Sequence, residues 1–202
     1  MGRRDPLAPA APPQPKRTDS IEIVEAIITA TCALADPEMS INDIAAKAGV
    51  GVASIYRYFP NRGAIYAEIA RRLHVEFLDK IRRLLATDGL SVDDAIAGGC
   101  ELAVSGSGVS RDLRHALNVW VPMSWSKATA DRVFATHITE ISRWLATRLD
   151  PLPSDLEQRV FMAFSAVRGI VLMWILHREA APSEEQVLAA SIAAARAVVF
   201  AA

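Results

Sequence analysis

Tyr56, Arg57 and Tyr58 are consecutive residues, and residues 49–54 just ahead of them are all small. Phenolic hydroxyls donate hydrogen bonds to phosphate oxygens, and arginine binds either a phosphate or the edge of a guanine. These residue types predict a surface that contacts a polyanion, with the two tyrosines on phosphates. The alternative is that the aromatic residues simply pack against the rest of the protein.

The surrounding residues predict two short helices joined by a tight turn. In the first helix, residues 41–48, Ala45 is small where a second helix must cross closely. Gly49 follows at the turn, where we expect a positive φ that glycine adopts at little cost. The second helix, residues 52–58, turns Ile55 towards the core. This arrangement is a helix-turn-helix.

The second of these helices suits the major groove of DNA, whose width of about 12 Å is close to the diameter of a helix. Small side chains at its start let the backbone approach the base edges. Pro60 ends this helix, and Asn61 is expected to cap the next one. The N–H groups at the start of that next helix, together with Arg62, predict a further phosphate contact.

The motif resembles the DNA-binding domain of the TetR (tetracycline repressor-like) family over roughly residues 20–70. The resemblance is carried by Ile23-Val24-Glu25-Ala26, Ile44-Ala45, Ala48-Gly49-Val50 and Ile55-Tyr56-Arg57-Tyr58-Phe59 followed by Arg62. It implies a homodimeric transcription factor, usually a repressor that a small ligand releases from a palindromic DNA operator. Carried over position by position, it implies DNA contacts at Ser40, Asn42, Val52, Ala53, Ser54, Tyr56, Tyr58 and Arg62. We add Arg57, the only long donor on the second helix.

Two positions depart from the family pattern. The connection after the first helix, Leu34–Glu38, lacks the usual glycine, so its path is expected to differ. Gly63 stands where an acidic residue is frequent, which weakens the start of the fourth helix.

The rest of the chain also predicts helices, because alanine is abundant and period-two alternation is scarce. Ser-x-x-acid or Ser-x-x-Gln boxes mark helix starts at Ser40, Ser91, Ser154 and Ser183. Prolines interrupt the runs between them. We expect an all-α fold with helices near 20–35, 41–48, 52–58, 61–86, 91–105, 110–119, 127–149, 154–179 and 183–201.

Three of the four tryptophans lie within residues 91–149, where Pro122 breaks a helix. Irregular backbone beside aromatic side chains suits a concave, mostly apolar site for a small molecule. With the family resemblance, this predicts an effector pocket for an apolar or aromatic ligand, although each residue can instead be ordinary core. The candidate residues are Asn118, Trp120, Met123, Trp125, Phe134, His137 and Trp144.

The last two expected helices, 154–179 and 183–201, are apolar over much of their circumference. Two apolar faces predict burial against the body on one side and against a second copy on the other, as in a two-fold four-helix interface. The alternative is the core of a large monomer. The candidate interface residues are Phe164, Val167, Val171, Trp174, Ala190 and Ala194.

Composition limits the possible partners only weakly. The net charge is −1, so no overall basic field attracts nucleic acid. Residues 1–19 are rich in proline and alanine and carry four basic side chains, which predicts a disordered arm that is either a solvated tail or a contact with a polyanion. The two cysteines read as small core hydrophobes.

These features predict three parts: the arm at 1–19, a DNA-binding head at 20–62, and a ligand-binding and dimerisation body at 63–202 that the fourth helix connects to the head. We see no secretory signal and no apolar run long enough to span a bilayer. The protein is therefore expected to be cytoplasmic and to have no membrane partner.

Catalysis is not expected. The four histidines, at positions 74, 115, 137 and 177, are scattered and lack the spacing of metal ligands. Ser105-Gly106-Ser107-Gly108 is not a nucleophile elbow, and no glycine-rich phosphate loop follows a strand. We expect no metal and no cofactor.

Together these observations predict a sequence-specific DNA-binding regulator, in the simplest case a repressor released by a small apolar or aromatic ligand. A dimer would place its two recognition helices ~34 Å apart, and the ligand would favour a body conformation in which the fourth helix swings and this spacing is lost. One alternative is an activator or a ligand-independent regulator on the same fold. The other is a helical small-molecule-binding protein that does not use DNA.

Overall fold

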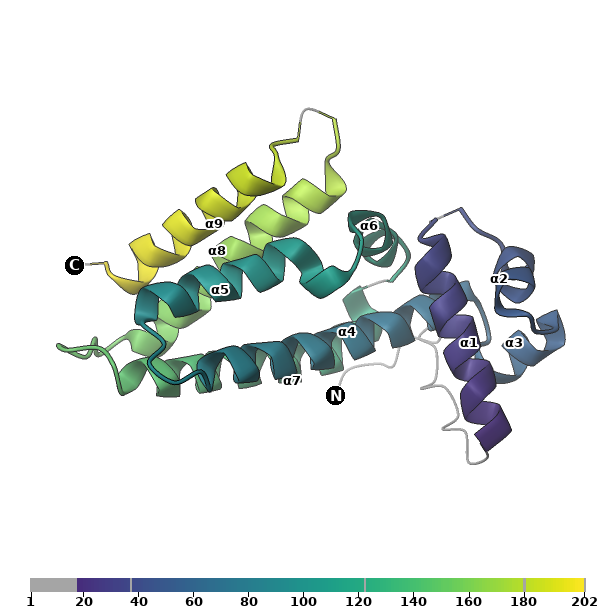
Figure 1. Ribbon diagram of the computed structural model, residues 1–202, viewed down its shortest axis with the longest axis horizontal. Coiled ribbons are helices and arrows are strands. Elements are labelled where there is room, and N and C mark those ends of the chain that lie inside the picture. The colour runs from purple at the N-terminus through teal and green to yellow at the C-terminus, as the bar shows by residue number, and fades with distance from the viewer. Residues whose placement is uncertain (1–17, 37, 122, 180, 202) are drawn as a thin grey trace. The chain divides into compact units, whose positions relative to one another are not determined.

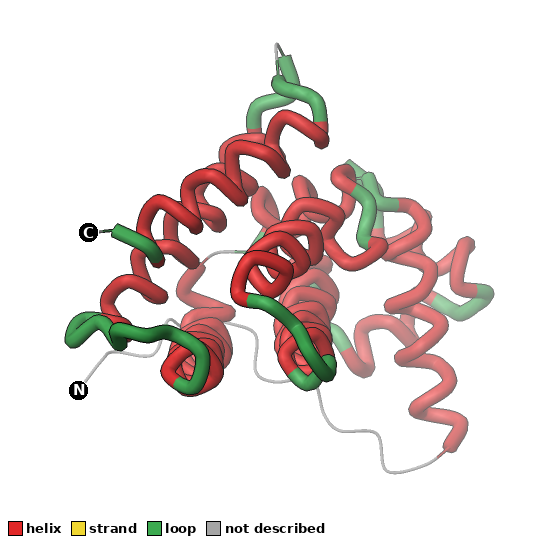
Figure 2. The backbone as a smooth tube through the Cα atoms, turned by 60° about the vertical axis from the view of Figure 1, so that its left-hand side comes forward, coloured by secondary structure: helices red, strands yellow, loops and turns green. Residues whose placement is uncertain are grey.

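The structure is a computed structural model that describes residues 18–36, 38–121, 123–179 and 181–201. Within these residues all regular secondary structure is helical, and short loops join the helices (Figure 2). The all-α class predicted from the sequence is confirmed. Residues 1–17 of the predicted arm lie outside the described residues.

The helices follow the predicted order, and the largest difference is that α7 begins at Met123 rather than at residue 127. Their bounds (Figure 1) are α1 Thr18–Leu34, α2 Ile41–Ala48, α3 Val52–Tyr58, α4 Arg62–Leu85, α5 Val92–Ser105, the short 3-10 helix η1 Gly106–Gly108, α6 Arg111–Trp120, α7 Met123–Ala146, α8 Leu156–Leu176 and α9 Glu184–Val199.

Serine side chains cap three of these helices as predicted. The N–H of Asp43 donates to Ser40 Oγ at 3.2 Å, and the N–H of Ser40 donates back to the Asp43 carboxylate at 2.7 Å. Ser183 and Gln186 form the same reciprocal box at α9, and Ser91 caps α5. Each cap satisfies backbone donors that have no partner within the helix.

The box predicted at Ser154 is wrong. The preceding turn runs further, so α8 begins at Leu156 after Asp155, whose side chain makes no capping hydrogen bond. Ser110 instead caps α6 by accepting the N–H of Leu113 at 3.2 Å. The sequence pattern missed this cap because leucine cannot complete the reciprocal bond.

Contacts divide the chain into two compact units. The first contains the described parts of Met1–Leu73 and Ser110–Ala130, and the second contains those of His74–Val109 and Asp131–Ala202. Helix α4 contributes to both, because the division falls between Leu73 and His74. Below, the head means the described residues of 18–73, and the body means the second unit.

The core of the head is built from apolar side chains on its four helices. Ile27, Ile44, Ile55 and Ile65 are each 0% exposed, as is Phe59 just after α3. Full burial of one such side chain contributes about 1.5–3 kcal/mol. The inward position predicted for Ile55 is therefore confirmed.

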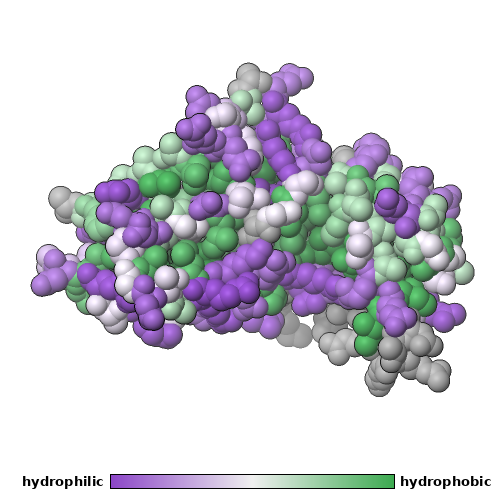
Figure 3. All heavy atoms as spheres, viewed as in Figure 1, coloured by the Kyte–Doolittle hydropathy of each residue, from purple (hydrophilic) through white to green (hydrophobic). Residues whose placement is uncertain are grey.

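In the body, α8 packs along α9 and also contacts α5 (Figure 1). Val167, Val171 and Trp174 of α8 share one buried cluster with Cys100 and Ala195. By length and composition alone, α8 could also cross a bilayer. The core helix of a helical protein passes the same test, and α8 buries one side in this way. In the view of Figure 3, apolar surface lies over the region of α5, α8 and α9, whereas hydrophilic surface follows α4.

Candidate DNA-binding and ligand-binding sites

The turn between α2 and α3 has the geometry that the sequence predicted. Gly49 has φ +68° and ψ +28°, the left-handed conformation expected of it. The N–H of Val50 donates to the carbonyl of Ala45 at 3.1 Å, which closes the end of α2. Ala45 is only 4% exposed, so its small side chain does lie where the helices pack. Helices α2 and α3 form a helix-turn-helix.

The outer surface of α3 carries the side chains of Tyr56 and Arg57. Tyr56 is 54% exposed, and Arg57 and Ala53 are exposed beside it, with Val52 and Ser54 half-buried. Small side chains therefore occupy the start of this surface, and donors occupy its end. This is a surface that could enter a groove.

Tyr58 is placed differently from Tyr56. Its side chain is 7% exposed and belongs to the buried residues of the head. The sequence analysis assigned both tyrosines to phosphates, but only Tyr56 has much surface to offer. Tyr58 is three residues after the buried Ile55, and this helical spacing is the signal that could have identified it as core.

At the start of α2, Asn42 and Ser40 are both exposed. Ser40 is also engaged locally, because its hydroxyl donates to the Asp43 carboxylate at 2.7 Å. The hydrogen bonds from Ser40 lower the pKa of Asp43, which therefore stays negative near neutral pH. A negative charge beside Ser40 disfavours a phosphate there, so Asn42 is the stronger candidate at this helix start.

Arg62 and Asn61 hold the connection into α4. Asn61 Oδ1 accepts the N–H of Ala64 at 2.9 Å, which confirms the predicted cap. Arg62 Nη1 donates to the carbonyl of Met39, in the segment before α2. Arg62 thus holds α4 to that segment, and its phosphate contact stays a prediction.

The segment between α1 and α2 contains the left-handed residue that a glycine commonly supplies. Ala35 has φ +48°, and its N–H donates to the carbonyl of Thr31 at 3.1 Å. One residue later, the hydroxyl of Tyr66 donates to the carbonyl of Asp36 at 3.1 Å. Burial raises the pKa of Tyr66 to about 12, so the hydroxyl remains a donor.

A charged network joins α1 to α4 within the head. Arg72 donates two hydrogen bonds of 2.8 Å to Glu25 and one of 2.8 Å to Glu68, and Arg71 binds both oxygens of Glu68 at 2.7 Å. Burial acts to raise the pKa of Glu68, but the bonds from the two arginines outweigh it and lower that pKa. Sequence reasoning missed this network, since Glu25 and Arg72 are far apart along the chain.

The predicted ligand residues fall into both units. Asn118 is exposed in the first unit, and its Nδ2 donates to the carbonyl of Arg114 at 2.8 Å. Phe134, His137 and Trp144 lie in the body. The side chains of Trp120, Met123 and Trp125 lie outside the described residues.

Two of those body residues belong to one aromatic cluster, which we define as Phe77, Phe134, His137, Phe161 and Phe164. The ring of His137 lies 5.3 Å from that of Phe77 on α4 and 5.5 Å from that of Phe164 on α8, centre to centre. Phe134 contacts Phe164 at 4.9 Å and Phe161 at 5.5 Å, both edge to face. Three helices, α4, α7 and α8, thus meet at this cluster.

Four of the predicted interface residues pack against other helices of the same chain. Val167, Val171 and Trp174 are buried against α5 and α9, and Phe164 packs in the aromatic cluster. Ala190 is exposed and Ala194 is half-buried. The outer apolar side chains of α8 are instead Phe161, Met162 and Met173, each about half exposed. Helical phase alone did not separate this outer face of α8 from its buried face.

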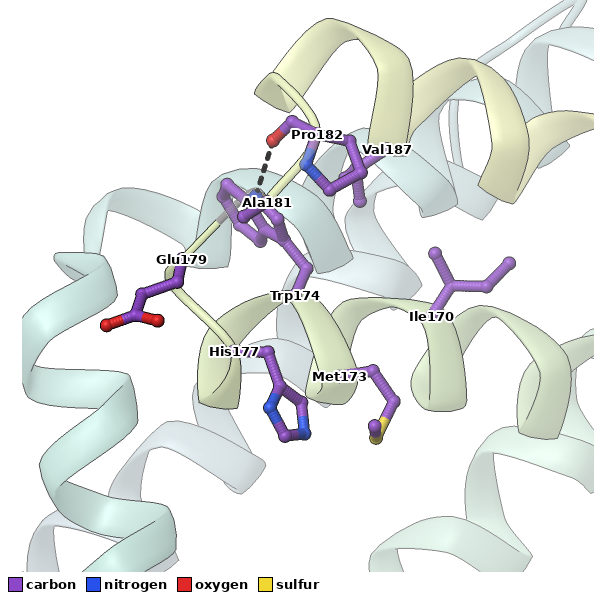
Figure 4. A pocket seen from close by; sticks show the side chains of 8 residues that line it. All are labelled: Ile170, Met173, Trp174, His177, Glu179, Ala181, Pro182 and Val187. Carbon is purple, nitrogen blue, oxygen red and sulfur yellow. Dashed lines mark hydrogen bonds between the residues drawn. The ribbon is translucent and has the colours of Figure 1, made fainter.

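A hollow of about 400 Å³ lies where α8 ends and α9 begins (Figure 4). Trp174 crosses it and donates its indole N–H to the carbonyl of Pro182 at 3.1 Å. Met173 and His177 also line the hollow, and they point away from Trp174 (Figure 4). Because its walls are mostly apolar, the hollow offers few groups that would orient a ligand.

Helices α2 and α3 have the arrangement that helix-turn-helix DNA-binding domains use. Residues 37–75 match the family described as bacterial regulatory proteins, tetR family. This segment is therefore a TetR-family DNA-binding domain, and the resemblance stated from the sequence is confirmed.

Solved structures with the same fold cover most of the chain. A tetR-family transcriptional regulator from Streptomyces coelicolor is 21% identical, with a TM-score of 0.67 over 90% of this chain and 83% of that one. SmeT, the repressor of the Stenotrophomonas maltophilia multidrug efflux pump SmeDEF, is 19% identical, with a TM-score of 0.60 over 90% of each chain. LfrR from Mycobacterium smegmatis, a TetR-like regulator in complex with proflavine, is 20% identical, with a TM-score of 0.54 over 90% of this chain and 97% of that one. No curated protein sequence matches the chain significantly.

Proposed function

We propose that this chain is a homodimeric, cytoplasmic repressor that binds a palindromic operator through α2 and α3 and is released by a small apolar or aromatic ligand. The observation that carries the proposal is the exposed pair Tyr56 and Arg57 on the outer surface of α3. The repressor role is supported by SmeT, which has the same fold and represses an efflux pump. A ligand is supported by the proflavine complex of LfrR.

Within this proposal, each exposed residue has a role. Tyr56 donates to a phosphate and sets the register of α3, whereas Arg57 and Asn42 contact base edges. Val52, Ala53 and Ser54 allow the backbone to approach the groove. Arg62 and Ser40 contribute less, because each is already bonded within the head. We leave Tyr58 out of the contact set, since it is buried.

The experiment is a salt-titrated binding assay on the promoter DNA beside the chain's own gene. The logarithm of the binding constant should fall linearly with the logarithm of the salt concentration. Arg57→Ala should weaken binding by about 10- to 100-fold and relax the preference for one base pair, whereas Tyr56→Phe should weaken binding to all sequences alike. Arg83→Ala, which removes an exposed arginine of the body, is the matched control.

Several results would contradict the DNA contacts. Binding to no salt-sensitive promoter fragment counts against the function as a whole. A loss with Arg83→Ala as large as that with Arg57→Ala would mean that only overall charge matters. A change of sequence preference with Tyr56→Phe would remove that residue from the phosphate contacts.

For the dimer we propose an outer face made of Met162, Gly169 and Met173 on α8 and Ala190 and Ala193 on α9. The two methionines are 48% and 54% exposed, and a Cβ placed on Gly169 would meet no atom within 4 Å. Apolar and small residues of this kind let helices of two copies approach closely. The solution mass at micromolar concentration should be about twice 21.9 kDa, and Met173→Glu should reduce it towards one chain. A wild-type mass of one chain would refute the dimer.

A further inference from the structure

His137 presents one unused hydrogen-bonding atom inside the body. Its Nδ1 lies 2.9 Å from the carbonyl oxygen of Val133. Because a carbonyl only accepts, Nδ1 carries the proton and donates it. Burial lowers the pKa of His137, so the ring is uncharged near neutral pH. The second nitrogen, Nε2, is then an acceptor with a free lone pair.

No hydrogen bond within the described residues satisfies this acceptor. His137 is 2% exposed, and its Nε2 has no partner. The rings that flank it, Phe77 and Phe164, offer only carbon atoms. Arg82 on α4 directs its donors to Glu140 and Asp79 instead. Since buried acceptors in folded proteins are almost always bonded, this lone pair is available to a donor from another molecule.

The aromatic cluster connects this acceptor to the surface. From His137 the rings continue to Phe164, then to Phe134 and to Phe161, which is 51% exposed. A planar apolar molecule could exchange ring contacts along this series without meeting a charged side chain of the cluster. Edge-to-face and tilted ring contacts are the kind that a flat ligand can replace.

We propose that the effector is an uncharged aromatic or apolar molecule with an O–H or N–H group, and that it binds in the aromatic cluster by donating this group to Nε2 of His137. The inference rests on the proposed function, because it names the ligand class of that regulator. Neither a carboxylate nor an ether satisfies a lone pair, so compounds that only accept are selected against.

The same contact reaches α4, one of the two helices that contribute to both units. Phe77, which flanks the imidazole, lies on α4, and residues 62–73 of that helix belong to the head's unit. A ligand that separates Phe77 from His137 therefore acts directly on α4. A ligand at Nε2 thereby changes DNA affinity through differential binding to two arrangements of this helix.

Three naphthalene probes test the donor requirement by fluorescence or calorimetric titration at pH 7.5. 2-Naphthol carries a hydroxyl donor, 2-methoxynaphthalene has the same ring without a donor, and 2-naphthoate is an anionic acceptor. The full-length protein should bind 2-naphthol about 10-fold more tightly than either of the others, which corresponds to about 1.4 kcal/mol.

Two substitutions of His137 separate Nε2 from Nδ1. His137→Asn keeps an amide N–H near the position of Nδ1 but removes Nε2, and it should abolish the 10-fold preference. His137→Gln places an amide oxygen near the position of Nε2, and it should retain part of the preference. His177→Asn, on an exposed histidine, should change nothing. Circular dichroism checks that each variant is folded.

The outcomes decide between a ligand acceptor and a bound water. Equal binding of all three probes, or no binding of any, would overturn the proposal, and so would a preference that survives in His137→Asn. These titrations contain no DNA, so they can fail while promoter binding is intact. In the reverse case, a His137-dependent preference without promoter binding would leave the ligand site standing and contradict the regulator.

Discussion

The head and the body treat their buried polar side chains in opposite ways. In the head, Thr31 donates to the carbonyl of Ile27 at 2.8 Å, and Glu68 accepts from two arginines. In the body, His137 and Ser191 are just as buried, but His137 Nε2 and Ser191 Oγ have no hydrogen-bond partner. Among the described residues of the head, by contrast, every buried side-chain nitrogen or oxygen atom is bonded.

In terms of the proposed function, this difference separates a region of fixed shape from the region that we propose binds the ligand. A fully bonded polar network favours a single arrangement, because any shift leaves a group unpaired. The head therefore suits a surface whose register on DNA must not vary. Unused bonding capacity in the body costs stability in the free protein, and a molecule that supplies the missing donors recovers that cost.

The largest effect should come from emptying the core of the head. Phe59→Ala should lower the free energy of unfolding by about 3–5 kcal/mol, because a fully buried ring leaves a cavity. The same change at Phe161, which is half exposed in the body, should cost about 1 kcal/mol or less. Urea denaturation of both variants measures the difference, and equal losses would mean that the two regions are packed alike.

Breaking the charged network should have the next largest effect. Glu68→Gln should cost about 1–3 kcal/mol, because Arg71 and Arg72 lose a charged partner at a buried site. Ser191→Ala, which removes an unbonded hydroxyl from the body, should be neutral or stabilising. Thermal unfolding of both variants checks the opposite signs, and a loss at Ser191 would show that this hydroxyl is bonded after all.

Acid should weaken the protein through His137. Its pKa is lowered in the folded state, so below pH 6.5 the unfolded chain binds a proton that the folded chain excludes. The free energy of unfolding should therefore fall as pH decreases from 6.5 to 5.5, by up to about 1.4 kcal/mol per pH unit. The lowered pKa values of Glu25 and Glu68 act at lower pH, below that window.

Urea denaturation across this window measures the slope, with His137→Asn as the control. Asparagine does not titrate there, so the slope should become smaller by the contribution of His137. An unchanged slope would mean that His137 does not exchange a proton between the folded and unfolded states in this range.

The smallest effect should come from the left-handed residue after α1. Ala35→Gly should stabilise the head by about 0.5–1 kcal/mol, because glycine relieves the strain of a positive φ but makes the unfolded chain more flexible. Gly49→Ala places the same methyl group at φ +68° with no atom nearby, and it should destabilise by a similar amount. If the melting temperature rises with Ala35→Gly and falls with Gly49→Ala, the effect comes from the backbone alone. A lower melting temperature with Ala35→Gly would contradict this explanation.

The sequence predicted features that depend on neighbouring residues. The helix order, the turn at Gly49, the caps at Ser40 and Ser183 and the inward position of Ile55 all follow from local spacing. In each case the atoms that decide the structure lie within a few residues of one another, so periodicity and capping chemistry are sufficient.

Features that depend on distant residues were not predictable in this way. Glu25 meets Arg72 only because α1 packs on α4, and no spacing in the sequence reveals that pair. The inner and outer faces of α8 were confused because both are apolar, so Val167 and Trp174 looked as suitable for an interface as Met162 and Met173. Tyr58 is different, because its spacing from the buried Ile55 is a local signal that places it in the core, whereas residue type alone suggested the role of Tyr56.

Helix α4 has a consequence for the folding of the whole chain. It runs unbroken through the boundary between the two units, so neither unit retains all of its packing if its half of α4 unravels. Disorder that begins in one unit then propagates along the backbone hydrogen bonds of a single helix into the other. Amide hydrogens on either side of Leu73 and His74 should consequently exchange with solvent in one common opening event, even though they are counted in different units.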